Sequence, residues 1–298
     1  MRAMLLAAGR GSRLKALTEE RAKPAVPFAN QPMAAVALGA LARAGVTEVV
    51  VNTHHLPETV RAALEAVAPT GVSLRFVVEE TLLGTGGGIA NVAEWLAEPG
   101  EAVFVMNSDV LFEPDLSAAR AVHDAAGAYA TMIVREDERA ARFGAVWVQD
   151  GRVRGIDGTS APKPEADAGV GRVFTGVHVL SPEALRALPA KGCVVRQGYA
   201  DWLNAGQTVA AQLASEPWED LGTPERYLAA HRMAAGTPVH PSATVDPNAT
   251  LEESWVGAGA RIGPVTLRRV VVWDGASVTQ DLEDAIVTRE GRVVRAGE

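Results

Sequence analysis

The chain alternates short apolar runs with segments of helical spacing up to about residue 235, and this alternation limits the folds that it can adopt. The apolar runs are rich in Val, Ile and Leu and are bounded by polar residues or glycine, which is typical of buried parallel strands. We therefore expect an α/β fold, a doubly wound, mostly parallel, Rossmann-like sheet that binds ligands at the carboxyl ends of its strands. The expected strands are 3–8, 46–51, 74–78, 102–106, 130–134, 143–148 and 172–180, and the expected helices are 32–44, 56–68, 87–96, 117–126, 182–188 and 224–235.

The character of the sequence changes after residue 236. Val239, Val245 and Leu251 recur every six residues, and after a slip of one residue the pattern continues to Ile262. A hexapeptide period is typical of a parallel β-helix, in which each short strand buries one aliphatic side chain. We expect a catalytic domain over residues 1–235 and a tail over residues 236–298 that forms a short left-handed β-helix. An ordinary β-hairpin tail is the alternative.

Charge and cysteine content restrict the partners and the compartment. The formal net charge of −8 disfavours nucleic acid and anionic membranes, because both attract basic surfaces. The apolar runs are too short to span a bilayer or to form the core of a secretory signal, so we expect neither. Cys193 is the only cysteine, which excludes an intramolecular disulfide and makes the reducing cytoplasm the expected compartment.

A glycine-rich loop follows the first expected strand. Gly9 and Gly11 let backbone N–H groups approach an anion closely, and Arg13 and Lys23 add positive charge. Leu14 stands where a dinucleotide-binding fold has its third glycine, and the Gly-Lys-Ser/Thr sequence of a P-loop is missing. The loop therefore predicts a nucleoside triphosphate site of another kind. A tight turn with two solvated basic residues is the alternative.

The spacing Gly-x-Gly-x-Arg, followed ten residues later by Lys-Pro, resembles the signature of the sugar-1-phosphate nucleotidyltransferases, or NDP-sugar pyrophosphorylases. The chain looks most like the mannose-1-phosphate guanylyltransferases, and its glycine run also resembles the uridylyltransferases that act on N-acetylmuramate 1-phosphate. The resemblance implies that Arg13 and Lys23 are catalytic. It also implies a nucleotide site formed by Leu6, Ala8, Gly9, Gly11, Ser12, Gly84, Thr85 and Gly86, with the glycine run placed before a helix.

Two aspartates are candidates for a Mg²⁺ site, and Mg²⁺ is the cofactor that the resemblance implies. Asp109 follows the expected strand 102–106 in Asn-Ser-Asp, where the family has a catalytic, metal-binding aspartate; a helix cap or turn residue is the alternative. Asp220 lies in Trp-Glu-Asp-Leu-Gly-Thr-Pro, which is similar to the segment whose aspartate completes the family's metal site. Thr223 and Pro224 independently predict a helix start, which would fix the loop that presents Asp220.

A third segment contains Lys163 between two prolines and resembles the family sequence Glu-Lys-Pro, whose lysine binds the phosphate of the sugar 1-phosphate. Pro162 replaces the glutamate that bonds sugar hydroxyls in the family, so this match does not define the sugar. The resemblance places Gly144, Thr175 and Gly176 beside the sugar as well.

These residues predict transfer of a nucleotidyl group from an NTP to a sugar 1-phosphate, giving an NDP-sugar and pyrophosphate. Mannose-1-phosphate guanylyltransferase is the first candidate, and a uridylyltransferase for N-acetylmuramate 1-phosphate or glucose 1-phosphate is the second. A non-catalytic subunit that binds NDP-sugar would be expected to lose Arg13, Lys23 or an aspartate. An acyltransferase would need a catalytic histidine within more coils, whereas the tail contains only His240. We expect the tail to serve structure or the assembly of a homo-oligomer.

Overall fold

The computed structural model of the protein describes residues 1–14, 16–162 and 170–296, which form two compact units. Unit 1 contains residues 1–9, 36–54 and 68–218, and unit 2 contains residues 10–35, 55–67 and 219–298. The boundary expected near residue 236 lies within unit 2 and stays a prediction. Among the described residues, no helix combines the length and the apolar character that crossing a membrane requires.

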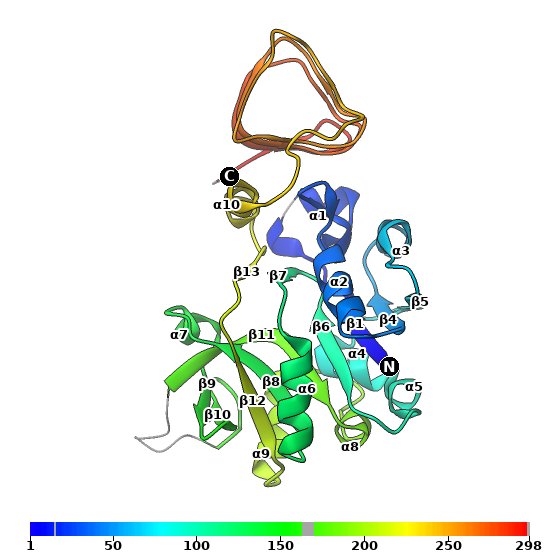
Figure 1. The fold of residues 1–298 in the computed structure, drawn as a ribbon, viewed down its shortest axis with the longest axis vertical. Helices are drawn as coiled ribbons and strands as arrows, with labels where there is room; N and C mark the ends of the chain where they lie inside the picture. The colour runs from blue at the N-terminus through cyan, green and yellow to red at the C-terminus, as the bar shows by residue number, and fades with distance from the viewer. Residues whose placement is uncertain (15, 163–169, 297–298) are drawn as a thin grey trace. The chain divides into compact units, whose positions relative to one another are not determined.

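Unit 1 is built around one sheet. Its strands are β1 (Arg2–Leu6), β4 (Glu48–Thr53), β5 (Ser73–Val78), β6 (Val103–Asn107), β8 (Ala130–Arg135), β9 (Val146–Gln149), β10 (Arg152–Ile156), β11 (Val170–Leu180) and β12 (Val209–Ala214). They lie in the order β5-β4-β1-β6-β11-β8-β12-β10-β9 (Figure 1). β5, β4, β1 and β6 are parallel neighbours, as are β8 and β12. β11 lies antiparallel between β6 and β8.

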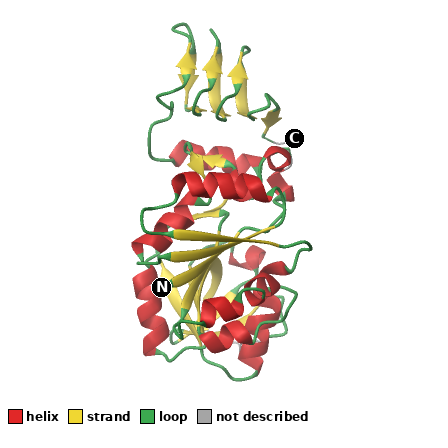
Figure 2. Ribbon diagram, turned by 90° about the vertical axis from the view of Figure 1, so that its right-hand side faces the viewer, coloured by secondary structure: helices red, strands yellow, loops and turns green. Residues whose placement is uncertain are grey.

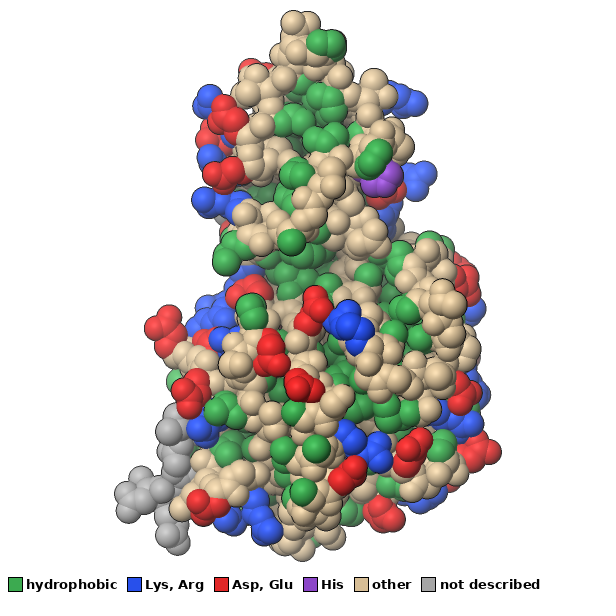
Figure 3. Space-filling model, in the orientation of Figure 1, with side chains coloured by type: hydrophobic (Ala, Val, Ile, Leu, Met, Phe, Trp, Pro, Cys, Tyr) green, Lys and Arg blue, Asp and Glu red, His purple; other side chains and the backbone are tan. Residues whose placement is uncertain are grey.

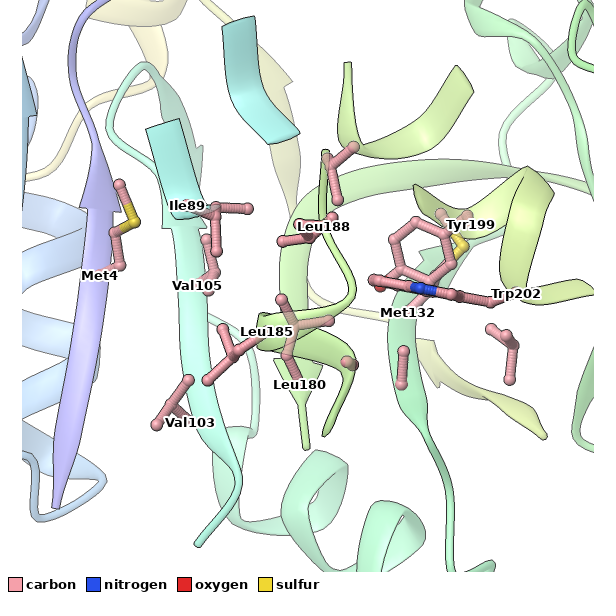
Figure 4. Close-up of a cluster of buried hydrophobic side chains, with 14 of the residues drawn as sticks. Met4, Ile89, Val103, Val105, Met132, Leu180, Leu185, Leu188, Tyr199 and Trp202 are labelled. Carbon is pink, nitrogen blue, oxygen red and sulfur yellow. The ribbon is translucent and has the colours of Figure 1, made fainter. Parts of the chain in front are cut away.

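Helices lie on both sides of this sheet (Figure 2). Figure 4 shows the core on one side, where strand residues such as Met4, Val105 and Met132 meet Leu185 and Trp202 from helices. The remaining elements of unit 1 are β7 (Val110–Phe112), α4 (Gly84–Ala90), α5 (Ala93–Ala97), α6 (Leu116–Ala125), α7 (Ala140–Phe143), α8 (Pro182–Arg186), a π-helix (Val194–Tyr199) and α9 (Ala200–Asn204). α2 (Ala35–Arg43) and β13 (Trp218–Asp220) cross from one unit to the other along the chain.

The prediction of a mostly parallel sheet is confirmed in part, because β10 and β11 run opposite to the other strands of the sheet. Asp150 and Gly151, both with positive φ (52° and 70°), form the tight turn that reverses the chain between β9 and β10. The prediction for the glycine run is wrong. The glycine run does not precede a helix: it forms α4 itself, and the single helix expected over 87–96 is divided between α4 and α5.

Unit 2 begins with the segment that follows the glycine loop. Its elements before the C-terminal region are a 3₁₀ turn (Ser12–Leu14), α1 (Leu17–Glu20), a second 3₁₀ turn (Lys23–Ala25), β2 (Pro27–Phe28), β3 (Gln31–Pro32), α3 (Pro57–Val67) and α10 (Pro224–Met233). The predicted start of α10 is confirmed, since Thr223 caps the N–H of Arg226 and Pro224 is the first helical residue.

Residues 239–296, here called the C-terminal coils, form a stack of short parallel strands that Figure 1 shows end-on as superimposed triangles. Thr244 pairs with Arg261, which pairs with Ser277, so successive coils lie in register. The aliphatic side chains of Ile262 and Val278 lie in the interior. The strands are β14 (Thr244–Val245), β15 (Thr250–Glu252), β16 (Trp255–Val256), β17 (Arg261–Ile262), β18 (Thr266–Val272), β19 (Ser277–Val278), β20 (Leu282–Val287) and the antiparallel β21 (Val293–Arg295).

Candidate active site

Unit 2 gathers three of the predicted site residues in one cluster of charges. Lys23 Nζ lies 3.4 Å from Oδ1 of Asp220, and Arg13 Nη1 lies 3.5 Å from Oδ2. Arg226, which the sequence analysis missed, lies 3.7 Å from the same Oδ2. The Lys23 and Asp220 side chains are only 6% and 11% exposed, whereas that of Arg13 is 65% exposed. One carboxylate therefore lies within ion-pair distance of three cations, which gathers positive charge at a place where an anionic ligand could bind.

Two glycines make this cluster possible. Gly11 has a φ of 64°, and a Cβ there would lie 2.9 Å from Cβ of Lys23 and 2.9 Å from Cγ2 of Thr18. A Cβ at Gly222 would lie 2.7 Å from Nη1 of Arg13. The guanidinium of Arg13 thus rests on the backbone of Gly222, directly before the start of α10. Ser12 is exposed and opens the intervening 3₁₀ turn, in which the N–H of Leu14 donates to the carbonyl of Gly11 (2.8 Å).

The carboxyl ends of β1, β4 and β6 lie side by side in unit 1, at the edge where ligand binding is predicted. The carbonyl of Leu6 accepts bonds from the Ser108 hydroxyl (2.6 Å) and N–H (3.1 Å), which fixes the backbone beside Asp109. Asn52 accepts a bond from the N–H of Ala7 (2.9 Å) and donates to Glu79 (2.7 Å). Asn52 and Glu79 are buried and were missed, although a polar residue at the end of an apolar run is a sequence signal for this edge.

The glycine run is packed against another part of unit 1. The N–H of Gly86 donates to the carbonyl of Gly192 (2.8 Å), and the Thr85 hydroxyl accepts a bond from the N–H of Val194 (2.9 Å). A Cβ at Gly84 would lie 2.5 Å from the carbonyl oxygen of Gly192. These glycines therefore serve close backbone packing, and their place in a nucleotide site stays a prediction.

The predicted sugar-phosphate residues have different surroundings. Gly144 and Gly176 both have a φ of 85°, and a Cβ at Gly176 would lie 2.5 Å from Nδ2 of Asn107. The Thr175 side chain is buried, its hydroxyl donates to the carbonyl of Ile133 (2.8 Å), and its own carbonyl accepts a bond from the ring N–H of Trp218 (2.9 Å). Lys163 lies outside the described residues. At Gly9, a Cβ would meet no atom within 4 Å, and Ala8 is the second residue after the end of β1 at Leu6.

The donor groups suit a hard divalent cation. Asp109 belongs to unit 1 and Asp220 to unit 2, and across the described residues no three His, Cys, Asp or Glu side chains gather as a metal-binding group. Mg²⁺ commonly takes only one or two carboxylates from the protein and completes its shell with substrate phosphates and water. The carboxylate of Asp220, loosely held by its cations, fits that requirement.

Comparisons with known proteins agree with this chemistry. Residues 2–236 match the nucleotidyl transferase family. The chain is 32% identical over 298 residues to the mannose-1-phosphate guanylyltransferase of Mycobacterium tuberculosis, a match covering 93% of this chain and 80% of that protein. It is 33% identical over 230 residues to the mannose-1-phosphate guanyltransferase of Schizosaccharomyces pombe, covering 76% of this chain and 62% of that protein. The chain thus spans somewhat less than two thirds of the yeast relative's length.

A solved structure is similar in fold. HddC from Yersinia pseudotuberculosis, complexed with GMP-PN, superimposes with a TM-score of 0.61 at 22% identity, covering 77% of this chain and 97% of that one. This likeness supports the mixed α/β nucleotidyltransferase fold. Enzymes of this family generally use a divalent metal ion. The family match over most of the chain and the mycobacterial relative together show that this chain belongs to the sugar-1-phosphate nucleotidyltransferases.

Proposed function

We propose that the protein transfers a guanylyl group from GTP to mannose 1-phosphate, with Mg²⁺ as cofactor, and releases pyrophosphate. The observation that carries the proposal is the buried pair of Lys23 and Asp220, with Arg13 laid over Gly222 beside it. Such a cluster is suited to hold phosphates whose charge is redistributed during transfer. The names of the mycobacterial and yeast relatives support the choice of base and sugar.

In the proposed reaction, a phosphate oxygen of the sugar 1-phosphate attacks the α-phosphorus of the NTP in line, and the bond from that phosphorus to the pyrophosphate oxygen breaks. The nucleophile is already anionic at neutral pH, so no general base is required. Lys23 binds near the α-phosphate, Arg13 stabilises the departing pyrophosphate, and Lys163 holds the incoming phosphate. Asp220 orients Lys23 and Arg13 before the substrates bind, which reduces the reorganisation needed in the transition state.

The metal and the substrates would be held by the remaining predicted residues. Asp109 and Asp220 would hold Mg²⁺, which when bound neutralises charge on the phosphate oxygens. The nucleotide would lie along the backbone of Leu6, Ala8, Gly9, Gly11 and Ser12 and against Gly84–Gly86, and the sugar phosphate beside Gly144, Thr175 and Gly176.

We also propose that the C-terminal coils are a left-handed β-helix and that they join two copies of the chain in the cytoplasm. The hexapeptide period and the parallel pairing support the β-helix. The first coil leaves apolar side chains partly uncovered, including Val245 and Leu251, and Figure 3 shows apolar side chains on this face between flanks of charged residues. Burial of such a face favours self-association.

Pyrophosphate release tests the proposed reaction. The purified protein is incubated with each NTP and a panel of sugar 1-phosphates, and we expect the highest kcat/KM for GTP with mannose 1-phosphate. A preference for UTP with N-acetylmuramate 1-phosphate or glucose 1-phosphate would replace that substrate assignment. Binding of an NDP-sugar without turnover of any pair would instead identify a non-catalytic subunit.

A further inference from the structure

The segment that carries Arg13 and Lys23 is fixed on one side by its own unit. The Leu14 and Leu17 side chains are fully buried, and the carbonyl of Thr18 contacts the His55 ring nitrogen at 2.6 Å. The N–H of Ala22 donates to the hydroxyl of Thr59 (3.1 Å). These contacts hold the apolar side of α1 and do not involve its acidic residues, Glu19 and Glu20.

Three consecutive residues at the end of α1 reach the C-terminal coils, which also belong to unit 2. Arg21 Nη2 lies 2.7 Å from Oδ2 of Asp274. Glu20 accepts bonds from the Thr288 hydroxyl and, at 3.3 Å, from the N–H of Glu290. Glu19 forms an ion pair with Arg292. The chain positions are more than 250 residues apart, yet all three contacts fall on the short stretch between Arg13 and Lys23.

The contacts differ in expected strength. Glu19 and Arg292 are exposed, so solvent screens their attraction and the pair contributes little. Thr288 is fully buried. Arg21 and Asp274 are 19% and 32% exposed, and the Arg21 guanidinium also lies 5.4 Å from the ring centre of buried Trp273. Burial alone raises the pKa of Asp274, but the Arg21 bond and charge outweigh it and hold that pKa below its usual value.

Packing alone does not fix Arg21. A cavity of about 290 Å³ adjoins the pair and is lined by residues that include Arg21, Ala63, His231, Trp273 and Asp274. Arg21 therefore has room to turn away once Asp274 no longer holds it. Because Lys23 lies two residues further along the chain, a movement of Arg21 would also displace the segment that carries the proposed phosphate-binding cations.

We propose that the C-terminal coils position the phosphate-binding segment, and that Asp274 and Thr288 are positioning residues for nucleotidyl transfer through Arg21 and Glu20. The inference rests on the proposed function of Arg13 and Lys23. Neither Asp274 nor Thr288 is among the residues proposed to bind substrate. They restrict the segment so that its cations meet the triphosphate in one geometry, and a small displacement of such groups has a large cost in rate.

The conformational part is tested by hydrogen exchange in the full-length protein. In Asp274→Asn and Thr288→Val, the amides of residues 11–14 and 16–23 should exchange faster than in the wild type. Asp284→Asn is the matched control, since it removes an exposed carboxylate that pairs with Arg269 on the same coils. Asp274→Glu should restore much of the protection. Unchanged exchange in both test variants would overturn the inference, whatever substrates the enzyme uses.

The functional part is tested by kinetics and binding. Asp274→Asn should lower kcat on the order of 10-fold and raise the KM for NTP, while the KM for sugar 1-phosphate stays near the wild-type value. In an Arg13→Ala background the same change should have a smaller effect. If exchange is faster in the variants but the wild-type protein shows no turnover, the proposed function is refuted and the positioning of the segment is not. Equal effects on both KM values, or full additivity with Arg13→Ala, would refute the positioning role.

Discussion

At the scale of single residues, Asp220 organises the candidate site, because its two oxygens face Lys23, Arg13 and Arg226. In the proposed mechanism this carboxylate has two tasks, since it holds cations in position and would offer an oxygen to a metal ion. An amide can perform neither task, because it has no charge and is a poor ligand for a hard cation.

Asp220→Asn should therefore lower kcat at least about 100-fold while the far-ultraviolet circular dichroism of the protein stays unchanged. Glu219→Gln is the control, since its carboxylate is the neighbour in sequence and lies 3.9 Å from Arg226. That variant should keep near-normal turnover. Steady-state pyrophosphate release at limiting Mg²⁺ is the measurement, and normal activity of Asp220→Asn there would refute its role as a metal ligand.

His231 gives a residue-scale prediction about pH. Its ring is buried, its Nε2 accepts a bond from the N–H of Ala29 (3.2 Å), and its Nδ1–H donates to the carbonyl of Tyr227 (2.8 Å). Burial lowers the pKa of His231 to about 4, although the Tyr227 bond opposes this. Below about pH 6.5 the His231 ring is protonated in the unfolded chain but stays neutral in the folded protein. His231 therefore lowers the free energy of unfolding as the pH falls toward 4.

The contribution of His231 should lower the free energy of unfolding by about 1 kcal/mol per pH unit as the pH falls from 6 to 4.5. His231→Gln should remove that contribution, measured by urea unfolding at several pH values. His178, whose pKa burial lowers to about 3, leaves a slope of its own in the variant. His240→Gln at the start of the coils is the comparison, and an equal loss of slope there would contradict the assignment.

At the scale of elements, the loop between β13 and α10 packs closely against Arg13 of the glycine loop. Gly222 has no positive φ, so its backbone accepts alanine, but a Cβ would lie 2.7 Å from Nη1 and 2.9 Å from Cζ of Arg13. The exposed end of Arg13 can move away at little cost in stability. The consequence should therefore appear in turnover and not in folding.

Gly222→Ala should lower kcat on the order of 10-fold with a change in unfolding free energy below about 1 kcal/mol. In α2, Gly39→Ala is matched to it, since the added Cβ would also meet an arginine Nη1, that of Arg43, at 3.3 Å. It should leave kcat unchanged. Because the effect passes through Arg13, Gly222→Ala in an Arg13→Ala background should add almost nothing, and a full further loss would refute the contact.

Elements also show what the sequence could and could not reveal. Short Val- and Leu-rich runs predicted β1, β4, β5, β6 and β8, because buried strands need continuous apolar side chains. β12 was missed because Val209–Ala214 is rich in alanine, which does not favour strands. The glycine run was placed before a helix because glycine disfavours helix interiors, whereas it forms α4 at a place where the backbone of residues 190–194 approaches too closely for a side chain.

Likewise, only some residues of the candidate site could be predicted from the sequence. Local motifs predicted Arg13, Lys23 and Asp220, since each is defined by its immediate neighbours in sequence. Arg226 lies in a helix with no motif of its own, and the pairing of Arg21 with Asp274 joins residues 253 positions apart. One sequence carries no signal for such a pairing, because many arginines and aspartates satisfy the same local pattern.

At the scale of the whole molecule, the C-terminal coils are joined to the rest of unit 2 by apolar and polar contacts together. Trp255 and Trp273 are buried, and their ring N–H groups donate to the His231 carbonyl (2.9 Å) and the Tyr227 hydroxyl (3.2 Å). Both acceptors belong to α10, which begins one residue after the Thr223 cap. The coils therefore support the helix that follows Asp220 as well as the segment that ends at Lys23.

Truncation after Ala235 should lower the unfolding free energy by several kcal/mol, since each buried tryptophan is worth roughly 3 kcal/mol or more. Thermal unfolding and light scattering of the truncated protein are the measurements. If the coils join two copies, the mass should fall to that of one chain, and the remaining folded enzyme should retain a measurable KM for both substrates with a reduced kcat. If the truncated protein keeps its oligomeric state and stability but lacks all activity, the coils supply part of the active site. Loss of positioning alone would leave Arg13, Lys23 and Asp220 in the chain and some activity with them.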